Sequence, residues 1–223
     1  GLLSPRHKGR THFACGGTPG QCNGSNAAAW FVCLALTFAV VFPPQARYIL
    51  KTELGVSDPD LLAATVFHSI YGPLTRFTGT TLPVTDRARV QAVIGERAEA
   101  AAYAHCVMNR SSFDEAVVQL REGAAGPFTV LVRADAPAPL ELTAAQLKDL
   151  MTVHFADWIQ QLEPYDFWGY RRAAYVSLAK ALGGRFLEAH AEKMEVQPEK
   201  YKTAVIEEMH KGQGAPSTGT SGA

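Results

Sequence analysis

The sequence lacks an excess of charge of either sign. Lysine plus arginine and aspartate plus glutamate both total 21, so the formal net charge is zero. Binding to nucleic acid or to an anionic surface would call for a basic excess or patch. The composition therefore indicates no nucleic-acid partner, and it leaves the oligomeric state open.

Cysteines and the common catalytic signatures are also scarce. The four cysteines (Cys15, Cys22, Cys33 and Cys106) form no Cys-x-x-Cys pair. This argues against a disulfide framework and favours a reduced compartment for the folded part. Gly16-Gly-Thr-Pro-Gly20 lacks the Gly-Lys-Ser/Thr ending of a phosphate-binding loop, and the sequence has no Gly-x-Ser-x-Gly nucleophile elbow. Nothing here points to a P-loop enzyme or an α/β hydrolase.

The two ends of the chain differ in composition from the middle. Residues 1–26 and 211–223 are rich in small and polar residues and are predicted to be disordered. Residues 27–42 carry no charge, and as a helix they would span about 24 Å, short of the ~30 Å hydrocarbon core. This segment up to residue 44 has three interpretations: a signal or membrane anchor, a buried core helix, or sequence foreign to the native domain. The first predicts a membrane-associated or organelle-targeted protein, and the others a cytoplasmic one.

From residue 45 to about 210 the pattern predicts one all-α domain. Helices are expected over 45–54, 57–72, 85–108 with a kink at Gly95, 113–120, 143–162, 168–182, 185–195 and 198–211. Serine or aspartate before Pro59 should cap the second helix, and Ser112 with Glu115 should form a capping box. Residues 128–142 are β-prone and interrupted by prolines, which predicts one small hairpin.

Several histidines are expected inside this domain. His68 lies at the end of a small-residue helix on the stripe that faces inward, and His105 shares a helix face with Asn109. His154 and Trp158 belong to the apolar stripe of the long helix over 143–162. The simplest interpretation of each histidine is an interior side chain with a hydrogen-bond partner, and the alternative is a ligand.

Three motifs carry a resemblance to a known family. Phe67-His-Ser-Ile-Tyr-Gly72, Ile94-Gly-Glu-Arg-Ala-Glu99 and Leu182-Gly-Gly184 resemble the recurring features of an uncharacterised domain family related to the HD-type metal phosphohydrolases. The resemblance covers about Tyr48 to His190 and implies an HD-like multi-helix fold. In that superfamily, histidines and aspartates from several helices hold divalent metals that activate water.

The chain departs from the HD pattern at two of its ligand positions. Ser69 stands where the aspartate of the His-Asp doublet is expected, and no histidine lies between His12 and His68 to supply the early ligand. The helix carrying Asp157 resembles the later aspartate helix of the (p)ppGpp-hydrolase branch. The resemblance therefore implies a metal site (Mn, Fe or Mg) formed by His68, Asp157 and His154, with Tyr71, His105, Asn109 and Arg110 as ligand-binding residues.

Three functional hypotheses follow. The first is a degenerate or non-standard HD-like protein that binds a small ligand, such as a phosphorylated one, or acts in regulation. The second is a metal-dependent phosphohydrolase acting on a nucleotide or another phosphoester. The third is a membrane-tethered interaction protein, which depends on residues 27–42.

Overall fold

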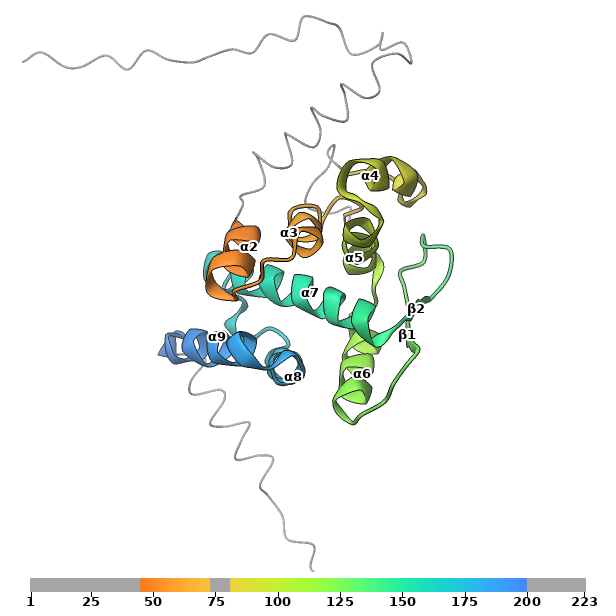
Figure 1. Cartoon of the computed structure of the whole chain (residues 1–223). Helices are drawn as coiled ribbons and strands as arrows, with labels where there is room; N and C mark the ends of the chain where they lie inside the picture. The colour runs from red at the N-terminus through yellow and green to blue at the C-terminus, as the bar shows by residue number, and fades with distance from the viewer. Residues whose placement is uncertain (1–44, 73–80, 200–223) are drawn as a thin grey trace, which may run out of the picture.

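A computed structural model describes residues 45–72 and 81–199. The architecture is all-α with one two-stranded hairpin, as predicted (Figure 1). Residues 1–44, 73–80 and 200–223 are not described, so the predictions for both ends of the chain and for the segment 27–42 lie outside the described residues.

The long helix α7, Ala144–Tyr165, forms the centre of the domain. Figure 1 shows it crossing the middle of the molecule, with α3 and α5 on one side and α8 and α9 on the other. It contacts α2, α3, α5, α6 and α8 and the strand β2. Its side chains Leu147, Leu150, Phe155 and Trp158 are buried in the main core. Because α7 touches so many elements, residues on it can meet residues from distant parts of the sequence.

The first half of the domain packs against one side of α7. It begins with α2 (Gln45–Tyr48), which continues as a π-helix, η2, over Ile49–Glu53. The helix α3 (Pro59–Val66) follows, then a 3-10 turn, η3 (Val84–Asp86), and the helices α4 (Arg87–Ile94) and α5 (Glu96–Val107). The predicted cap is Asp58, whose carboxylate accepts hydrogen bonds from the backbone N–H groups of Asp60 and Leu61.

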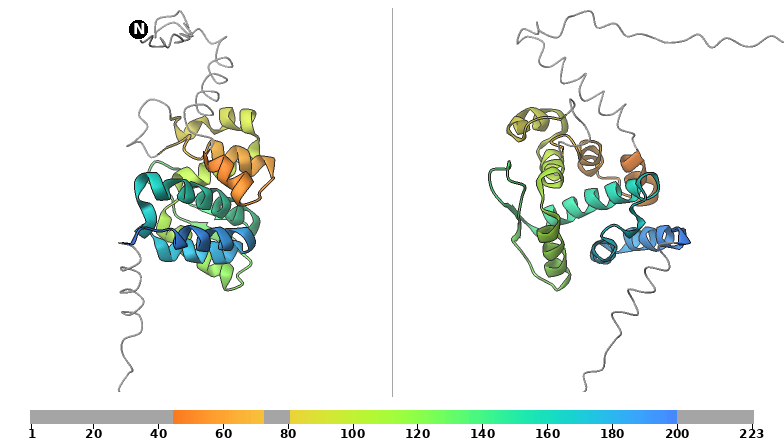
Figure 2. Two further views of the ribbon diagram at one scale, coloured as in Figure 1. Left: turned by 90° about the vertical axis from the view of Figure 1, so that its left-hand side faces the viewer. Right: turned by 180° about the vertical axis from the view of Figure 1, so that it is seen from behind.

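The second half comprises the hairpin and the remaining helices. The helix α6 spans Arg110–Arg121, and the strands β1 (Phe128–Val130) and β2 (Leu140–Leu142) pair antiparallel. After α7 come a 3-10 turn, η4 (Phe167–Gly169), and the helices α8 (Arg172–Leu182) and α9 (Gly184–Glu195). Figure 2 shows α8 and α9 side by side in both of its views, in agreement with their contacts.

Four details of the predicted helices are wrong. The helix α3 ends at Val66, so His68 lies in the turn that follows it, not in its last turn. Gly95, with φ of 86°, separates α4 from α5 instead of kinking one helix. Residues 168–182 are split because Arg171 has a left-handed conformation, with φ of 46°. The cap of α6 is Asn109, whose side chain accepts hydrogen bonds from the backbone N–H groups of Ser111 and Ser112.

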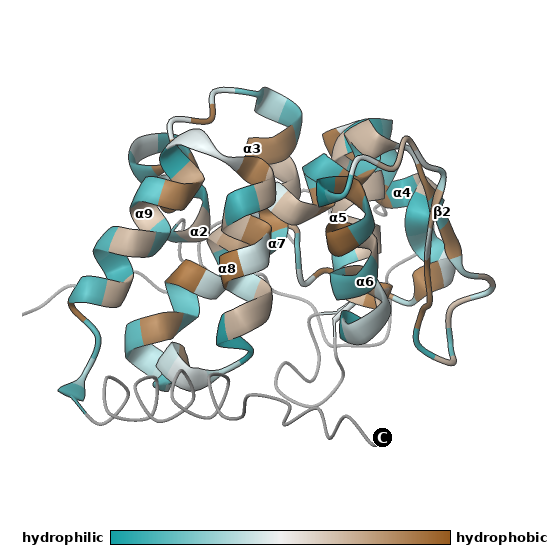
Figure 3. Ribbon diagram, turned by 90° about the horizontal axis from the view of Figure 1, so that it is seen from below, coloured by the Kyte–Doolittle hydropathy of each residue, from teal (hydrophilic) through white to brown (hydrophobic). Residues whose placement is uncertain are grey.

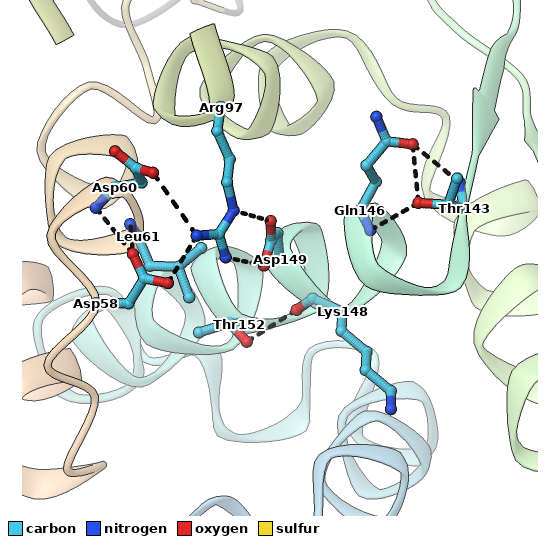
Figure 4. A network of polar contacts seen from close by, with 9 residues as sticks. All are labelled: Asp58, Asp60, Leu61, Arg97, Thr143, Gln146, Lys148, Asp149 and Thr152. Carbon is cyan, nitrogen blue, oxygen red and sulfur yellow. Dashed lines mark hydrogen bonds and ion pairs between the residues drawn. The ribbon is translucent and has the colours of Figure 1, made fainter. Parts of the chain in front are cut away.

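The helices are amphipathic, and polar contacts tie their exposed faces together. Figure 3 shows hydrophobic and hydrophilic residues alternating around α6, α8 and α9. On another face, Arg97 of α5 binds both carboxylate oxygens of Asp149 at 2.9 and 3.0 Å and the carboxylate of Asp58 at 2.8 Å (Figure 4). This arginine therefore links α5 to α7 and to the start of α3.

Candidate metal centre

Two helices and one turn bring imidazoles and a carboxylate together inside the domain. His68 comes from the turn after α3, His105 from α5, and His154 and Asp157 from α7. Residues three apart on a helix share a face, which is why His154 and Asp157 both point inward. The side chains of His105 and Asp157 are only 5% and 9% exposed, and that of His68 is 14% exposed.

Asp157 is the central group of this cluster. Its Oδ1 lies 3.1 Å from His68 Nε2, and its Oδ2 lies 3.5 Å from His105 Nε2. Gln161, one turn further along α7, donates a hydrogen bond of 2.6 Å to Oδ1. Burial acts to raise the pKa of Asp157, but the two imidazoles outweigh it and hold that pKa well below its usual value. The carboxylate is therefore ionised, and it only accepts hydrogen bonds.

Backbone carbonyls determine which nitrogen of two imidazoles carries the proton. His68 Nδ1 lies 2.6 Å from the carbonyl oxygen of Thr65, and His105 Nδ1 lies 3.0 Å from that of His68. A carbonyl only accepts, so we assign the N–H of both rings to Nδ1. Metal-ligating histidines commonly show the same arrangement, with the second ring nitrogen bonded to a carbonyl. In their neutral forms both rings turn an Nε2 lone pair towards Asp157.

The two imidazoles facing Asp157 differ in their affinity for a second proton. Burial acts to lower the pKa of His68, but the charge of Asp157 outweighs it, so this pKa is raised. A proton on His68 Nε2 then satisfies Asp157 Oδ1. For His105, burial dominates and the pKa is lowered, so the ring is neutral, and with its proton assigned to Nδ1 its Nε2 faces Asp157 Oδ2 as a lone pair. Of the two imidazole–carboxylate pairs, only His68 Nε2 and Asp157 Oδ1 therefore have a proton between them.

His154 adds a further lone pair to the same place. Its Nδ1 lies 3.3 Å from His105 Nε2, and the guanidinium of Arg110, which only donates, lies 2.8 Å from Nδ1 and 3.2 Å from Nε2. From the shorter contact we assign the lone pair to Nδ1, which lets Nε2 donate to the hydroxyl of Tyr175 at 3.1 Å. Burial, followed by the charge of Arg110, lowers the pKa of His154 well below its usual value. The ring is therefore neutral.

The ligand atoms of His105, His154 and Asp157 form a compact group. They all lie within 4.8 Å of one another, and all three residues are buried. The edge of a tetrahedron with metal–ligand bonds of about 2.0–2.1 Å is about 3.4 Å, close to the 3.3 and 3.5 Å separations measured from His105 Nε2. His105 Nε2 and Asp157 Oδ2 face each other as acceptors, and the spacing of the group fits a divalent metal.

The structure places the predicted site residues in three different settings. His154, Asp157 and His105, which had been assigned to ligand binding, form the compact group, and His68 lies beside it on the other carboxylate oxygen. Arg110 also reaches the cluster, whereas Asn109 caps α6. Whether any of these residues binds a ligand stays a prediction.

Tyr71 belongs to a second buried network. Its hydroxyl donates to Glu99 at 2.8 Å, and Arg87 and Gln91 complete the coordination of that carboxylate. Glu99 is the last residue of the motif Ile94-Gly-Glu-Arg-Ala-Glu99, so this motif carries a structural carboxylate. The hydroxyl of Tyr71 thus has a protein partner, and its role in ligand binding stays a prediction.

Sequence reasoning did not select Gln161 or Tyr175 for the site. Gln161 stands four residues after Asp157, a spacing that predicts contact on a helix. Tyr175 stacks on Trp158 with ring centroids 4.2 Å apart, and its hydroxyl reaches His154. Its neighbour in space comes from another helix, so no local signal marked it.

The free energy of unfolding of the chelator-treated protein is expected to fall as the pH drops from about 7 to 5. His105 and His154 have lowered pKa values through burial, and burial followed by Arg172 lowers that of His190 to about 4. Unfolding lets each of these imidazoles take up a proton below a pKa of about 6.5, which costs up to about 1.4 kcal/mol of stability per pH unit for each proton.

The contribution of His68 to the free energy of unfolding changes with pH in the opposite direction. Its pKa is raised in the folded protein, so its contribution is complete below about 6.5 and is lost as the pH rises through the folded value. Asp157 contributes above its unfolded pKa of about 3.9, outside this window. The three histidines with a lowered pKa outweigh His68, so the net effect is a loss of stability at the lower pH. Urea unfolding in EDTA at pH 5 and at pH 7 measures this net effect. An unfolding midpoint at pH 5 equal to or above that at pH 7 would contradict it.

Comparison with known proteins gives one match. A family model described as a domain of unknown function (DUF6817) matches residues 50–110, which include His68, His105 and Arg110 but neither His154 nor Asp157. No curated protein and no solved structure matches the chain. The match supports an uncharacterised domain in this segment, and it gives the resemblance to HD-type phosphohydrolases no support of its own.

Among residues 45–72 and 81–199, no helix combines the length and the apolar character needed to cross a bilayer. The segment 27–42, on which the membrane hypothesis rests, lies outside these residues.

Proposed function

We propose that this protein is a non-standard HD-like domain that binds a divalent transition metal and, with it, a small phosphorylated ligand. One observation carries the proposal: the ligand atoms of His105, His154 and Asp157 are buried and all lie within 4.8 Å of one another. A buried set of this kind is costly unless a cation neutralises it.

The donor set indicates the class of metal. Two imidazoles and one carboxylate suit Fe, Mn, Co or Zn, whereas Mg prefers oxygen ligands. Of the metals that the resemblance implies, Fe and Mn therefore fit better than Mg. His68, on the other carboxylate oxygen, acts as a positioning residue that orients Asp157.

Charge supports an anionic ligand. The divalent metal and the guanidinium of Arg110 would face a single ionised carboxylate, that of Asp157, among the groups described in the cluster. The remaining positive charge is best neutralised by an oxyanion, and a phosphate group binds both a metal and an arginine.

A metal-dependent phosphohydrolase is the second candidate. Three protein ligands leave coordination positions open, as in metal sites that activate water. Asp157, His105 and His154 would hold the metal and Arg110 the phosphate. The same purified protein tests both candidates.

The experiment measures metal content and affinity of the full chain after reconstitution with Mn, Fe, Co or Zn. We expect one metal per chain, lost in His105→Gln and His154→Gln, and bound about 10–100-fold more weakly in His68→Gln. His190→Gln is the matched control, because His190 is also buried but stacks on Trp158. Metal binding that survives both His105→Gln and His154→Gln would overturn the proposal.

Hydrolysis of p-nitrophenyl phosphate by the metal-loaded protein separates the two candidates. Turnover that disappears in His105→Gln and persists in His190→Gln supports the phosphohydrolase. Metal-loaded protein that binds inorganic phosphate without turnover supports the binding domain. Loaded protein that neither binds nor hydrolyses these probes would contradict a phosphorylated ligand.

A further inference from the structure

Arg110 occupies the place at His154 that the metal needs. Its guanidinium nitrogen lies 2.8 Å from His154 Nδ1, the atom that faces His105 Nε2 at 3.3 Å. An N–H donor and a metal cannot use the same lone pair at once. Arg110 therefore has to leave His154 Nδ1 before this histidine can become a ligand.

The position of Arg110 allows such a movement. It is the first residue of α6, it is partly exposed, and its backbone is fixed independently of its side chain. Asn109 caps the helix, and Arg171 donates to the carbonyl oxygen of Arg110 at 3.1 Å. The guanidinium can thus change its partner while the helix start stays in place.

The charge of Arg110 also acts on the whole cluster. Its guanidinium nitrogen lies 2.8 Å from His154 Nδ1, which lies 3.3 Å from His105 Nε2, so its positive charge disfavours further positive charge in the cluster. The same repulsion applies to a divalent cation at the centre of the cluster. An anion placed beside the guanidinium would cancel that repulsion and give the arginine an alternative partner.

We propose that Arg110 is a gate that couples metal binding to anion binding. Without an anion it holds His154 Nδ1, and an oxyanion draws it away so that the metal can bind. By linkage, the metal raises the affinity for the anion by the same factor as the anion raises that for the metal. This inference rests on the proposed metal centre and adds its regulation: the metal and the oxyanion bind cooperatively.

The test uses Co²⁺ as the metal and sulfate as the oxyanion, with the full chain. Visible absorption of bound Co²⁺ gives its affinity with and without sulfate, at constant ionic strength set with sodium perchlorate. For the unmodified protein we expect sulfate to tighten Co²⁺ binding about tenfold, within the usual 5–150-fold range of such couplings. Equal affinity with and without sulfate would overturn the gate.

Arg110→Gln should bind Co²⁺ about tenfold more tightly than the unmodified protein in the absence of sulfate, and sulfate should no longer change its affinity. Arg121→Gln is the matched control, since Arg121 ends the same helix, is exposed and contacts Ser177. It should behave like the unmodified protein. An Arg110→Gln affinity equal to or below that of the unmodified protein would overturn the gate, as would an unchanged sulfate effect.

The outcomes also separate this inference from the proposed function. Co²⁺ binding that depends on His105 but not on Arg110 or sulfate leaves the metal centre and removes the gate. Absence of Co²⁺ binding in both the unmodified protein and Arg110→Gln overturns both. Thermal unfolding checks that each variant is folded, and the sulfate effect on the unmodified protein stands without any variant.

Discussion

Replacing Asp157 with asparagine is expected to abolish stabilisation of the protein by metal. A metal present at 100 times its Kd should raise the free energy of unfolding of the unmodified protein by about 2.7 kcal/mol. Asp157→Asn keeps the size of the side chain but removes the negative charge that a buried divalent ion requires. Unfolding in urea with and without Co²⁺ or Mn²⁺ measures the difference.

The metal-free state of the same variant provides the control. Asparagine has an amide N–H that can donate to the bare lone pair of His105, which the carboxylate cannot do. In EDTA, Asp157→Asn should therefore unfold cooperatively and keep the helical signal of the unmodified protein. If metal stabilises this variant as much as the unmodified protein, Asp157 is not a ligand.

Replacing Glu99 with alanine is expected to give the largest loss of stability, about 3–5 kcal/mol. Glu99 has no exposed surface, and its two oxygens accept hydrogen bonds from Tyr71, Arg87 and Gln91. Arg87 is about one-third exposed and can turn to water, whereas Tyr71 is only 1% exposed and would keep a buried hydroxyl without its partner. Urea unfolding measures the loss.

Tyr71→Phe is the matched control for this network. It removes one hydrogen bond to the carboxylate, worth about 1.5–3 kcal/mol, and leaves the pairing of Glu99 with Arg87 in place. Its loss should be smaller than that of Glu99→Ala. Metal affinity should be the same in both variants, because neither residue touches the metal cluster in the contacts described. A loss below about 1 kcal/mol for Glu99→Ala would contradict the structural role given to this carboxylate.

Local chemistry in the sequence was sufficient for much of the fold. Thr143 and Gln146 form a capping box at the start of α7, where the sequence predicts that a helix begins. Pro59 lies in the first turn of α3, behind the cap Asp58, and the prolines after Val130 lie between the two strands of the predicted hairpin. In each case the signal lies within a few residues of the feature that it specifies.

Features that depend on distant contacts were not predictable in this way. The face shared by His105 and Asn109 assumes one helix, but Met108 is extended and pairs with Val132 of the hairpin. The backbone N–H of Asn109 donates to the carbonyl oxygen of Leu131 at 2.7 Å, which ends α5 and starts α6. A tertiary contact thus outweighed the helical pattern.

In the candidate metal centre too, some features follow from local sequence patterns and others depend on tertiary contacts. The spacing of His154 and Asp157 on one helix indicated that both could serve one site. The place of His105 as the third member of the compact group depends on how α5 packs against α7. The resemblance drew attention to His68, which the structure places on Oδ1 of Asp157, whereas His105 faces Oδ2. No pattern within the sequence decides which of these histidines faces the other two ligand atoms.

X-ray absorption at the edge of the bound metal tests the central claim most directly. The full chain would be loaded with one equivalent of Co²⁺ or Zn²⁺, with His105→Gln as the comparison. We predict scattering from two imidazole rings and from carboxylate oxygen at about 2.0–2.2 Å, and no bound metal in the variant. A metal surrounded by oxygen alone, or a chain that takes up no metal, would contradict a centre formed by His105, His154 and Asp157.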